Sequence, residues 1–265
     1  MSGIVTKDPS YTATILKAAN SAFNRSSDNK VDDVNEAIGN IGFQKVKDAL
    51  LNNAAFKFFK NDKNEQFCLV GLWEHSLGVA ETSREIAKFL GKPWFEVAYT
   101  CGLMHDIGKV ARFKLDELDN TGFFVKDSQF AQEKSLSFFQ AEIVNQSPRH
   151  DYLGYLLCQH WGMSACLESV VMWHHEPDVS KRDLSSVRGS KEQVHLLIDV
   201  IIIANWFVHY FRFGFSGHRS TERPPNSLLK RLEISDSNMN ILMKRIEALL
   251  AQTKEIAKIK FQKKS

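Results

Sequence analysis

The chain has 265 residues, of which 43% are hydrophobic and 25% are charged. This composition is typical of a globular protein, and the length is enough for one large domain or two small ones. The formal net charge is only +3, well below the strongly basic footprint of a dedicated nucleic-acid binder, so we expect no specific nucleic-acid partner. The basic stretch at residues 254–265 is typical of a solvated tail.

Other features predict a soluble protein of the cytoplasm with no membrane partner. The most apolar run, Leu196–Val208, is interrupted by Asp199 and Asn205, and it is shorter than the roughly 20 residues that a membrane helix needs. The amino terminus lacks the apolar core of a signal peptide. The cysteines form no CxxC pair and lie in apolar, helix-like stretches, as buried thiols of a reducing compartment do: Cys68, Cys101, Cys158 and Cys166.

Apolar residues recur at helical spacing along almost the whole chain, which predicts an all-α fold. Residues 1–65 form a smaller helical part, with a helix predicted at Tyr11–Ala22, a loop at 24–30 and helical structure over 34–59. Residues 66–217 form the core, and residues 218–265 form a carboxyl-terminal part with an amphipathic helix over Asn238–Lys258. Within the core, we expect long loops at 116–129 and 182–192 because neither stretch has a clean period.

Two apolar stripes mark inward faces of the core helices. They consist of Leu72, Ser76, Val79, Ser83, Ile86 and Leu90, and of Leu167, Val170, Val171 and His174. Candidate metal ligands lie on or next to these helical segments in a definite order, and they are His75, His105 with Asp106, His150, and His174 with His175. Ligands from separate rigid elements can surround an ion, and an imidazole and carboxylate set suits iron, zinc, manganese or nickel. An adjacent His-Asp pair can also bridge two ions.

Each of these residues also has a simpler interpretation when it is taken alone. His75 could be a core histidine with ordinary hydrogen bonds, His150 could be a surface residue after Pro148, and His174 with His175 could close a helix. A purely structural module, in which the histidines bond only one another, is a further alternative. It would require many satisfied partners for several buried imidazoles.

Several segments resemble the HDOD domain family, whose members are related to the HD-type metal-dependent phosphohydrolases. Residues 8–10 (Asp-Pro-Ser), 15–22 (Ile-Leu-Lys-Ala-Ala-Asn-Ser-Ala) and 37–42 (Ala-Ile-Gly-Asn-Ile-Gly) resemble its amino-terminal signature. The metal-binding core shared with HD-GYP proteins resembles residues 73–76 (Trp-Glu-His-Ser), 102–109 (Gly-Leu-Met-His-Asp-Ile-Gly-Lys), His150 with Gly154, and 173–177 (Trp-His-His-Glu-Pro). The resemblance covers residues 6–217 and implies a multi-helix HD-like bundle.

The resemblance also implies a ligand set, which is His75, His105, Asp106, His150, His174 and His175, with Asn205 where the family has a terminal acid. An amide is a poor ligand beside a carboxylate, so Asn205 should weaken one of up to two metal sites. Asp199 lies six residues earlier and is not expected to compensate. HDOD domains usually have another helix before the Asp-Pro segment, whereas this chain starts almost at that segment, so we expect a start that is truncated or misassigned.

The resemblance favours a regulatory signal-transduction protein whose partner is another protein or a small phosphorylated ligand. The Gly-Tyr-Pro motif of the cyclic-dinucleotide phosphodiesterases is missing after the His-His pair, so that activity is not expected. The alternative is a metal-dependent phosphohydrolase acting on a nucleotide or phosphodiester, in which Asp106 and Lys109 are catalytic and Lys109 neutralises a phosphate. Lys109 could equally be a surface lysine on the last turn of its helix. An open pocket lined by Lys109 would favour the enzyme, whereas a centre capped by side chains would favour the regulatory module.

Overall fold

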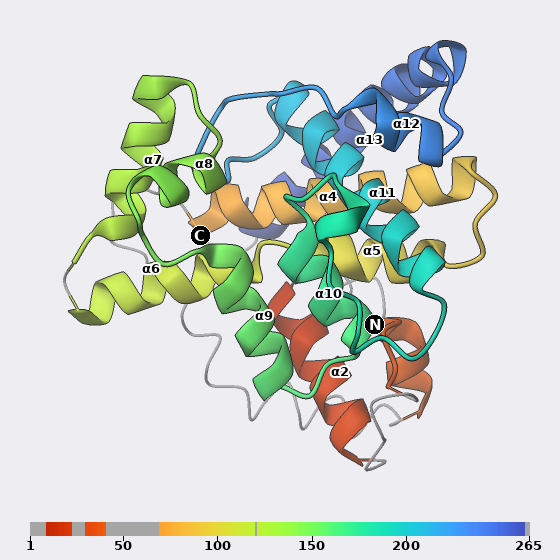
Figure 1. Cartoon of the computed structure of the whole chain (residues 1–265), viewed down its shortest axis with the longest axis horizontal. Coiled ribbons are helices and arrows are strands. Elements are labelled where there is room, and N and C mark those ends of the chain that lie inside the picture. Colours follow the sequence, from red (N-terminus) through yellow and green to blue (C-terminus); the bar gives the residue numbers. More distant parts are fainter. Residues whose placement is uncertain (1–8, 23–29, 41–68, 120, 263–265) are drawn as a thin grey trace.

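The structure is a computed structural model that describes residues 9–22, 30–40, 69–119 and 121–262. Within these ranges the regular elements are helices, which confirms the predicted all-α class (Figure 1). The helices are α2 (Pro9–Ala22), α4 (Leu69–Phe89), α5 (Phe95–Met104), α6 (Ile107–Asp119), α7 (Phe123–Lys134), α8 (Phe138–Val144), α9 (His150–His160), α10 (Ala165–Trp173), the short 3-10 helix η3 (Val179–Lys181), α11 (Lys191–Tyr210), α12 (Asn226–Arg231) and α13 (Asp236–Gln262). Residues 34–40 are also helical.

The long helix α4 lies in the middle of the molecule, with α5, α11 and α13 packed against it (Figure 1). A second group packs beside it, in which α9 contacts both α6 and α10. One apolar cluster runs through α2, α5, α10, α11 and α13, so the amino-terminal helices share the core of the remaining chain. The division at residues 65 and 217 stays a prediction.

Polar side chains fix where several of these helices begin. Ser137 and Gln140 form a reciprocal capping box at α8. Ser164 and Ser190 accept hydrogen bonds from the first-turn backbones of α10 and α11. These caps set the start of each helix. In α10, the helix that begins at the Ser164 cap ends at the cap residue His174.

The prediction of a long loop at residues 116–129 is wrong. Helix α6 continues to Asp119 and α7 begins at Phe123, and the short turn is stabilised by Asp116, which accepts hydrogen bonds from Thr121 Oγ1 at 2.9 Å and from the Phe124 backbone. The helical period was obscured because two apolar residues here, Leu115 and Leu118, are exposed. The second predicted loop is confirmed, since residues 182–190 contain no helix.

Two helices predicted from the sequence, Tyr11–Ala22 and Asn238–Lys258, correspond to α2 and α13. Helix α11 is apolar and long enough by composition to cross a membrane, but 61% of its most apolar stretch is buried within the protein, as in a core helix. The described cysteines, Cys101, Cys158 and Cys166, are free thiols. Cys68 and residues 41–59 of the predicted helical stretch lie outside the described residues.

Candidate metal centre

Four elements bring the predicted ligands together. His75 lies on α4, His105 and Asp106 form the turn between α5 and α6, and His150 is the first residue of α9. His174 caps the end of α10 and His175 follows it. Five of these six side chains are at most 1% exposed, so His150 is not a surface residue.

A close backbone crossing places α6 against α9. A Cβ atom added to Gly108 would lie 1.8 Å from the carbonyl oxygen of His150 and 2.6 Å from the nitrogen of Gly154. Only glycine permits this approach. Asp106, two residues before Gly108, is therefore held beside His150 by contact between two main chains.

The Asp106 carboxylate lies between two sets of imidazoles. Its Oδ2 is 3.6 Å from His75 Nε2 and 3.3 Å from His105 Nε2. Its Oδ1 is 3.3 Å from His150 Nε2 and 3.5 Å from His174 Nε2. Potential ligand atoms within 4.8 Å of one another accordingly form two groups, one of His75, His105 and Asp106, the other of Asp106, His150, His174 and His175.

Hydrogen bonds at the far side of three rings point Nε2 into the centre. When protonated, His105 Nδ1 donates to the Gly102 carbonyl and His174 Nδ1 to the Val171 carbonyl, each at 2.7 Å. His150 Nδ1 lies 2.7 Å from Glu142 Oε2. Partners of this kind fix the tautomer and orientation of metal-binding histidines.

The centre contains buried polar atoms with no hydrogen-bond partner among the described residues. They are Nε2 of His75, His105 and His174, and Oδ1 of Asp106. Buried polar atoms are nearly always satisfied, so such a cluster requires an explanation. Imidazole nitrogens and a carboxylate oxygen converging from separate helices are a chemically suitable donor set for a divalent transition metal. The residues present therefore fit the metal that the sequence predicts.

Burial keeps most of these imidazoles neutral, as metal ligands must be. It lowers the pKa of His174 to about 4 and that of His75 and His175 well below the usual range. Burial alone would raise the pKa of Asp106, but the neighbouring His105 and Lys109 outweigh this effect and hold the pKa well below its usual range. The pKa of His150 shifts in the opposite direction. Burial lowers its pKa, but Glu142 outweighs this effect and the net shift is upward.

Helix α11 contributes residues at the edge of the centre. Asn205 has a buried Oδ1 with no hydrogen-bond partner in the described part of the chain, and it belongs to neither group of ligand atoms. His209, one turn later, has its ring centroid 4.7 Å from that of His75 and 4.1 Å from that of His218. The sequence reasoning missed His209 and His218. The spacing of four residues between Asn205 and His209 was the available signal, because it puts both on one helix face.

Asp199 does not reach the centre, as the sequence analysis expected. Its Oδ1 accepts from Arg182 Nη2 at 2.6 Å and from Arg231 Nη2 at 2.9 Å, and its Oδ2 accepts from Arg231 Nε at 2.7 Å. The acid is therefore already bound by two guanidinium groups.

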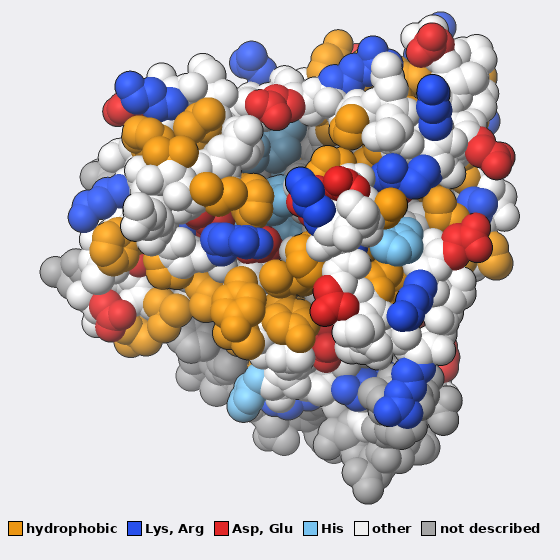
Figure 2. Space-filling view, in the orientation of Figure 1, with side chains coloured by type: hydrophobic (Ala, Val, Ile, Leu, Met, Phe, Trp, Pro, Cys, Tyr) orange, Lys and Arg blue, Asp and Glu red, His pale blue; other side chains and the backbone are white. Residues whose placement is uncertain are grey.

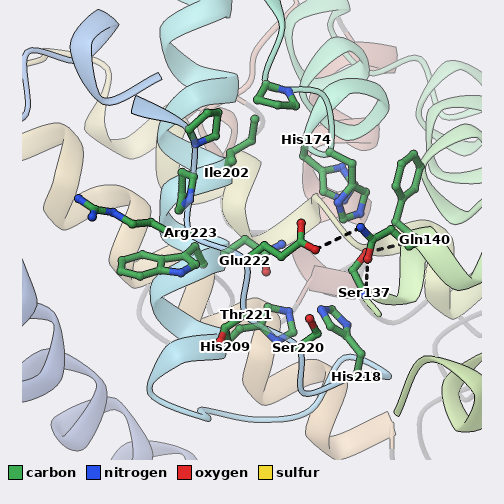
Figure 3. Close-up of a pocket in the computed structure, with 17 residues that line it drawn as sticks. Ser137, Gln140, His174, Ile202, His209, His218, Ser220, Thr221, Glu222 and Arg223 are labelled. Atoms are coloured by element: carbon green, nitrogen blue, oxygen red, sulfur yellow. Dashed lines mark hydrogen bonds between the residues drawn. The ribbon is translucent and has the colours of Figure 1, made fainter. Parts of the chain in front are cut away.

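A pocket of ≈ 300 Å³ opens beside the centre. Figure 2 shows histidine side chains in the hollow of this face, and Figure 3 shows Glu222 reaching across the pocket to Gln140, whose Nε2 donates to Glu222 Oε1 at 3.4 Å. The lining residues that also border the histidine cluster are His174, His175, Asn205, His209 and His218.

Lys109 does not line this pocket. It lies in the first turn of α6, not the last, and is 1% exposed. Its Nζ donates to Asp106 Oδ2 at 2.8 Å. The interpretation of Lys109 as a surface lysine is therefore wrong, and its predicted catalytic role stays a prediction.

Comparisons with known proteins identify the family. The sequence matches none of the curated proteins with which it was compared. Similar folds occur in an HDOD domain protein with unknown function from Geobacter sulfurreducens (22% identity, 96% of this chain and 83% of that chain, TM-score 0.58) and in the response regulator MmoQ from Methylococcus capsulatus (18%, 91% and 87%, 0.63). A third is a "Putative phosphohydrolase" from Shewanella amazonensis (21%, 95% and 82%, 0.51). The HDOD domain model matches residues 1–177, and the chain therefore belongs to the HDOD domain family.

Proposed function

We propose that this protein is a regulatory HDOD protein of the cytoplasm whose HD-like centre binds one or two divalent transition metal ions. The observation that carries the proposal is the Asp106 carboxylate, each oxygen of which faces one histidine set. Around it, the buried Nε2 atoms of His75, His105 and His174 have no hydrogen-bond partner among the residues that the structure describes. Iron, zinc and manganese suit these donors. The free thiols Cys101, Cys158 and Cys166 support a reducing compartment.

A regulatory role is favoured over catalysis because the site departs from a hydrolytic one. Asn205 is neutral where the family has an acid, and Lys109 is directed to Asp106 instead of the pocket. In this role the metal stabilises the packing of four helical elements, and the pocket binds a small phosphorylated ligand or the neighbouring surface binds a protein partner. Fold alone does not establish chemistry.

Metal content tests the proposal. The protein should be purified without chelator and without nickel affinity, and compared with the double variant His105→Ala, Asp106→Ala and with His160→Ala, a control histidine on the exposed end of α9. We expect about one or two equivalents in the wild type and the control, and none in the double variant. Circular dichroism checks that all three fold. A wild-type protein without metal would leave only the metal-free interaction module.

A second candidate, a metal-dependent phosphohydrolase, is favoured by one observation. His174 and His175 belong both to a ligand group and to the wall of the pocket, so a ligand in the pocket would lie next to a bound metal. A metal in this position would act as a Lewis acid toward a phosphate ester. Assays with nucleotides and phosphodiesters, with Asp106→Asn as the background, decide between the candidates. Turnover above that background would favour the enzyme, and none would favour the regulatory protein.

A further inference from the structure

We infer that the two halves of the centre are not equivalent. In the half formed by His75 and His105, Lys109 supplies a permanent positive charge next to Asp106. The chain binds a single divalent metal ion in the other half, which is formed by His150, His174 and His175. This inference rests on the proposed metal centre and goes further, because it fixes the number of ions and the half that binds.

The first observation is the position of the Lys109 ammonium group. It bonds Asp106 Oδ2 at 2.8 Å, and Oδ2 is the oxygen that also faces His75 and His105. The ammonium lies 5.2 Å from the centroid of the buried Phe138 ring, a favourable cation–π position. With 1% of the side chain exposed, the charge stays inside the protein, next to the place where an ion in this half would lie.

The opposite oxygen has different neighbours. Asp106 Oδ1 lies near the Nε2 atoms of His150 and His174, and it accepts no hydrogen bond from the described residues. An oxygen that accepts no hydrogen bond from these residues is available to a metal ion, whereas Oδ2 already accepts from Lys109.

The balance of charge favours the same half. Asp106 is the one acid among the six predicted ligands, and Lys109 offsets it, while Asn205 adds no charge. Behind the Oδ1 half, Arg112 bonds both Glu142, at 2.5 Å, and Asp127. These two carboxylates and one guanidinium group together carry one net negative charge. Glu142, one of the two acids, lies with its Oε2 2.7 Å from His150 Nδ1. A cation bound by His150 is therefore stabilised, but a second cation beside Lys109 would be repelled.

A single ion also fits the shape of the site. His174 and His175 line the pocket, whereas His75, His105 and Lys109 do not. The half with His150, His174 and His175 therefore contributes side chains to this pocket, and the half with His75, His105 and Lys109 contributes none. A lone ion next to the pocket can hold one anionic group, such as a phosphate, but it cannot form the symmetric clamp of two-metal hydrolases.

Zinc titration of the metal-free protein tests this inference. Calorimetry and elemental analysis should give one equivalent of Zn²⁺ for the wild type. His174→Ala should weaken zinc binding at least about 100-fold, and its matched partner His75→Ala should keep one equivalent with less than about a tenfold change. Lys109→Met should admit a second equivalent, whereas Lys109→Arg, which keeps the charge, should stay at one.

Two equivalents in the wild type, or loss of zinc in His75→Ala, would overturn the inference and leave the proposed metal centre standing. A wild type that binds no zinc would overturn both. If Lys109→Met does not fold, the wild-type stoichiometry and the two histidine variants still decide the question.

Discussion

Two buried aspartates, Asp106 and Asp199, show the difference between a binding centre and a structural ion pair. Both are at most 1% exposed. Each oxygen of Asp199 accepts from a guanidinium group. Asp106, in contrast, has an oxygen without a hydrogen bond among the described residues, and three of the imidazole nitrogens around it, Nε2 of His75, His105 and His174, also lack one. The fourth, His150 Nε2, lies 2.9 Å from His175 Nε2. Burial is therefore common to both sites, and unsatisfied hydrogen-bonding capacity is the feature that separates them.

The largest effect on stability is expected at Asp199, the acid whose oxygens all accept hydrogen bonds. In Asp199→Asn the fully buried Arg182 would lose its counter-charge, and removing one partner of a buried pair costs about 3–5 kcal/mol. Urea unfolding measures this loss, and the zinc stoichiometry should not change. Glu85→Gln is the control because its pair with Arg245 is partly exposed and worth at most about 1 kcal/mol. If Asp199→Asn lowers the free energy of unfolding as little as the control does, Asp199 is not the structural ion-pair partner described above.

The next effect concerns metal affinity. Glu142→Gln should weaken zinc binding about 10- to 100-fold, because Glu142 orients His150 and raises its basicity. Asp127→Asn is the matched control. Asp127 also bonds Arg112 but instead of His150 it bonds Asn145. Competition with a zinc-binding dye measures both variants. Equal losses in the two would mean that Glu142 acts through the packing of Arg112 and not through His150.

The smallest effect, counted for one histidine over one pH unit, is a dependence of stability on pH. Burial lowers the pKa of His174 to about 4 and that of His209 to about 3, so between pH 6.5 and about 4 these groups bind a proton when unfolded but not when folded. Stability of the metal-free protein should therefore fall on acidification, by up to about 1.4 kcal/mol per pH unit for each histidine. His150, whose pKa is raised, contributes with the opposite sign.

Urea unfolding at several pH values between 7 and 4 measures this dependence, and His209→Gln should reduce its slope. An unchanged slope in that variant would show that His209 gains a proton in the folded protein as readily as in the unfolded one.

The sequence was a good guide to the helices and to the order of the ligands. Periodicity predicted α2, α10 and α13 because their apolar residues are the buried ones. It failed at α6 and α7, where exposed Leu115 and Leu118 break the link between apolar character and burial. His209 and His218 could not be assigned from the order of ligands. His218 lies beside His209 at the edge of the centre, and Gly214, with φ +67°, lets the loop before it lie against the backbone of α4 at His75.

The crossing at Gly108 has a consequence for how the centre tolerates sequence change. Main-chain atoms set the spacing between α6 and α9 there, and their dimensions do not depend on side-chain rotamers. We therefore expect substitutions elsewhere in the apolar core to move side chains more than they move Asp106 relative to His150. The relative positions of these two ligands therefore depend less on the side chains of the surrounding core than on two glycines, Gly108 and Gly154.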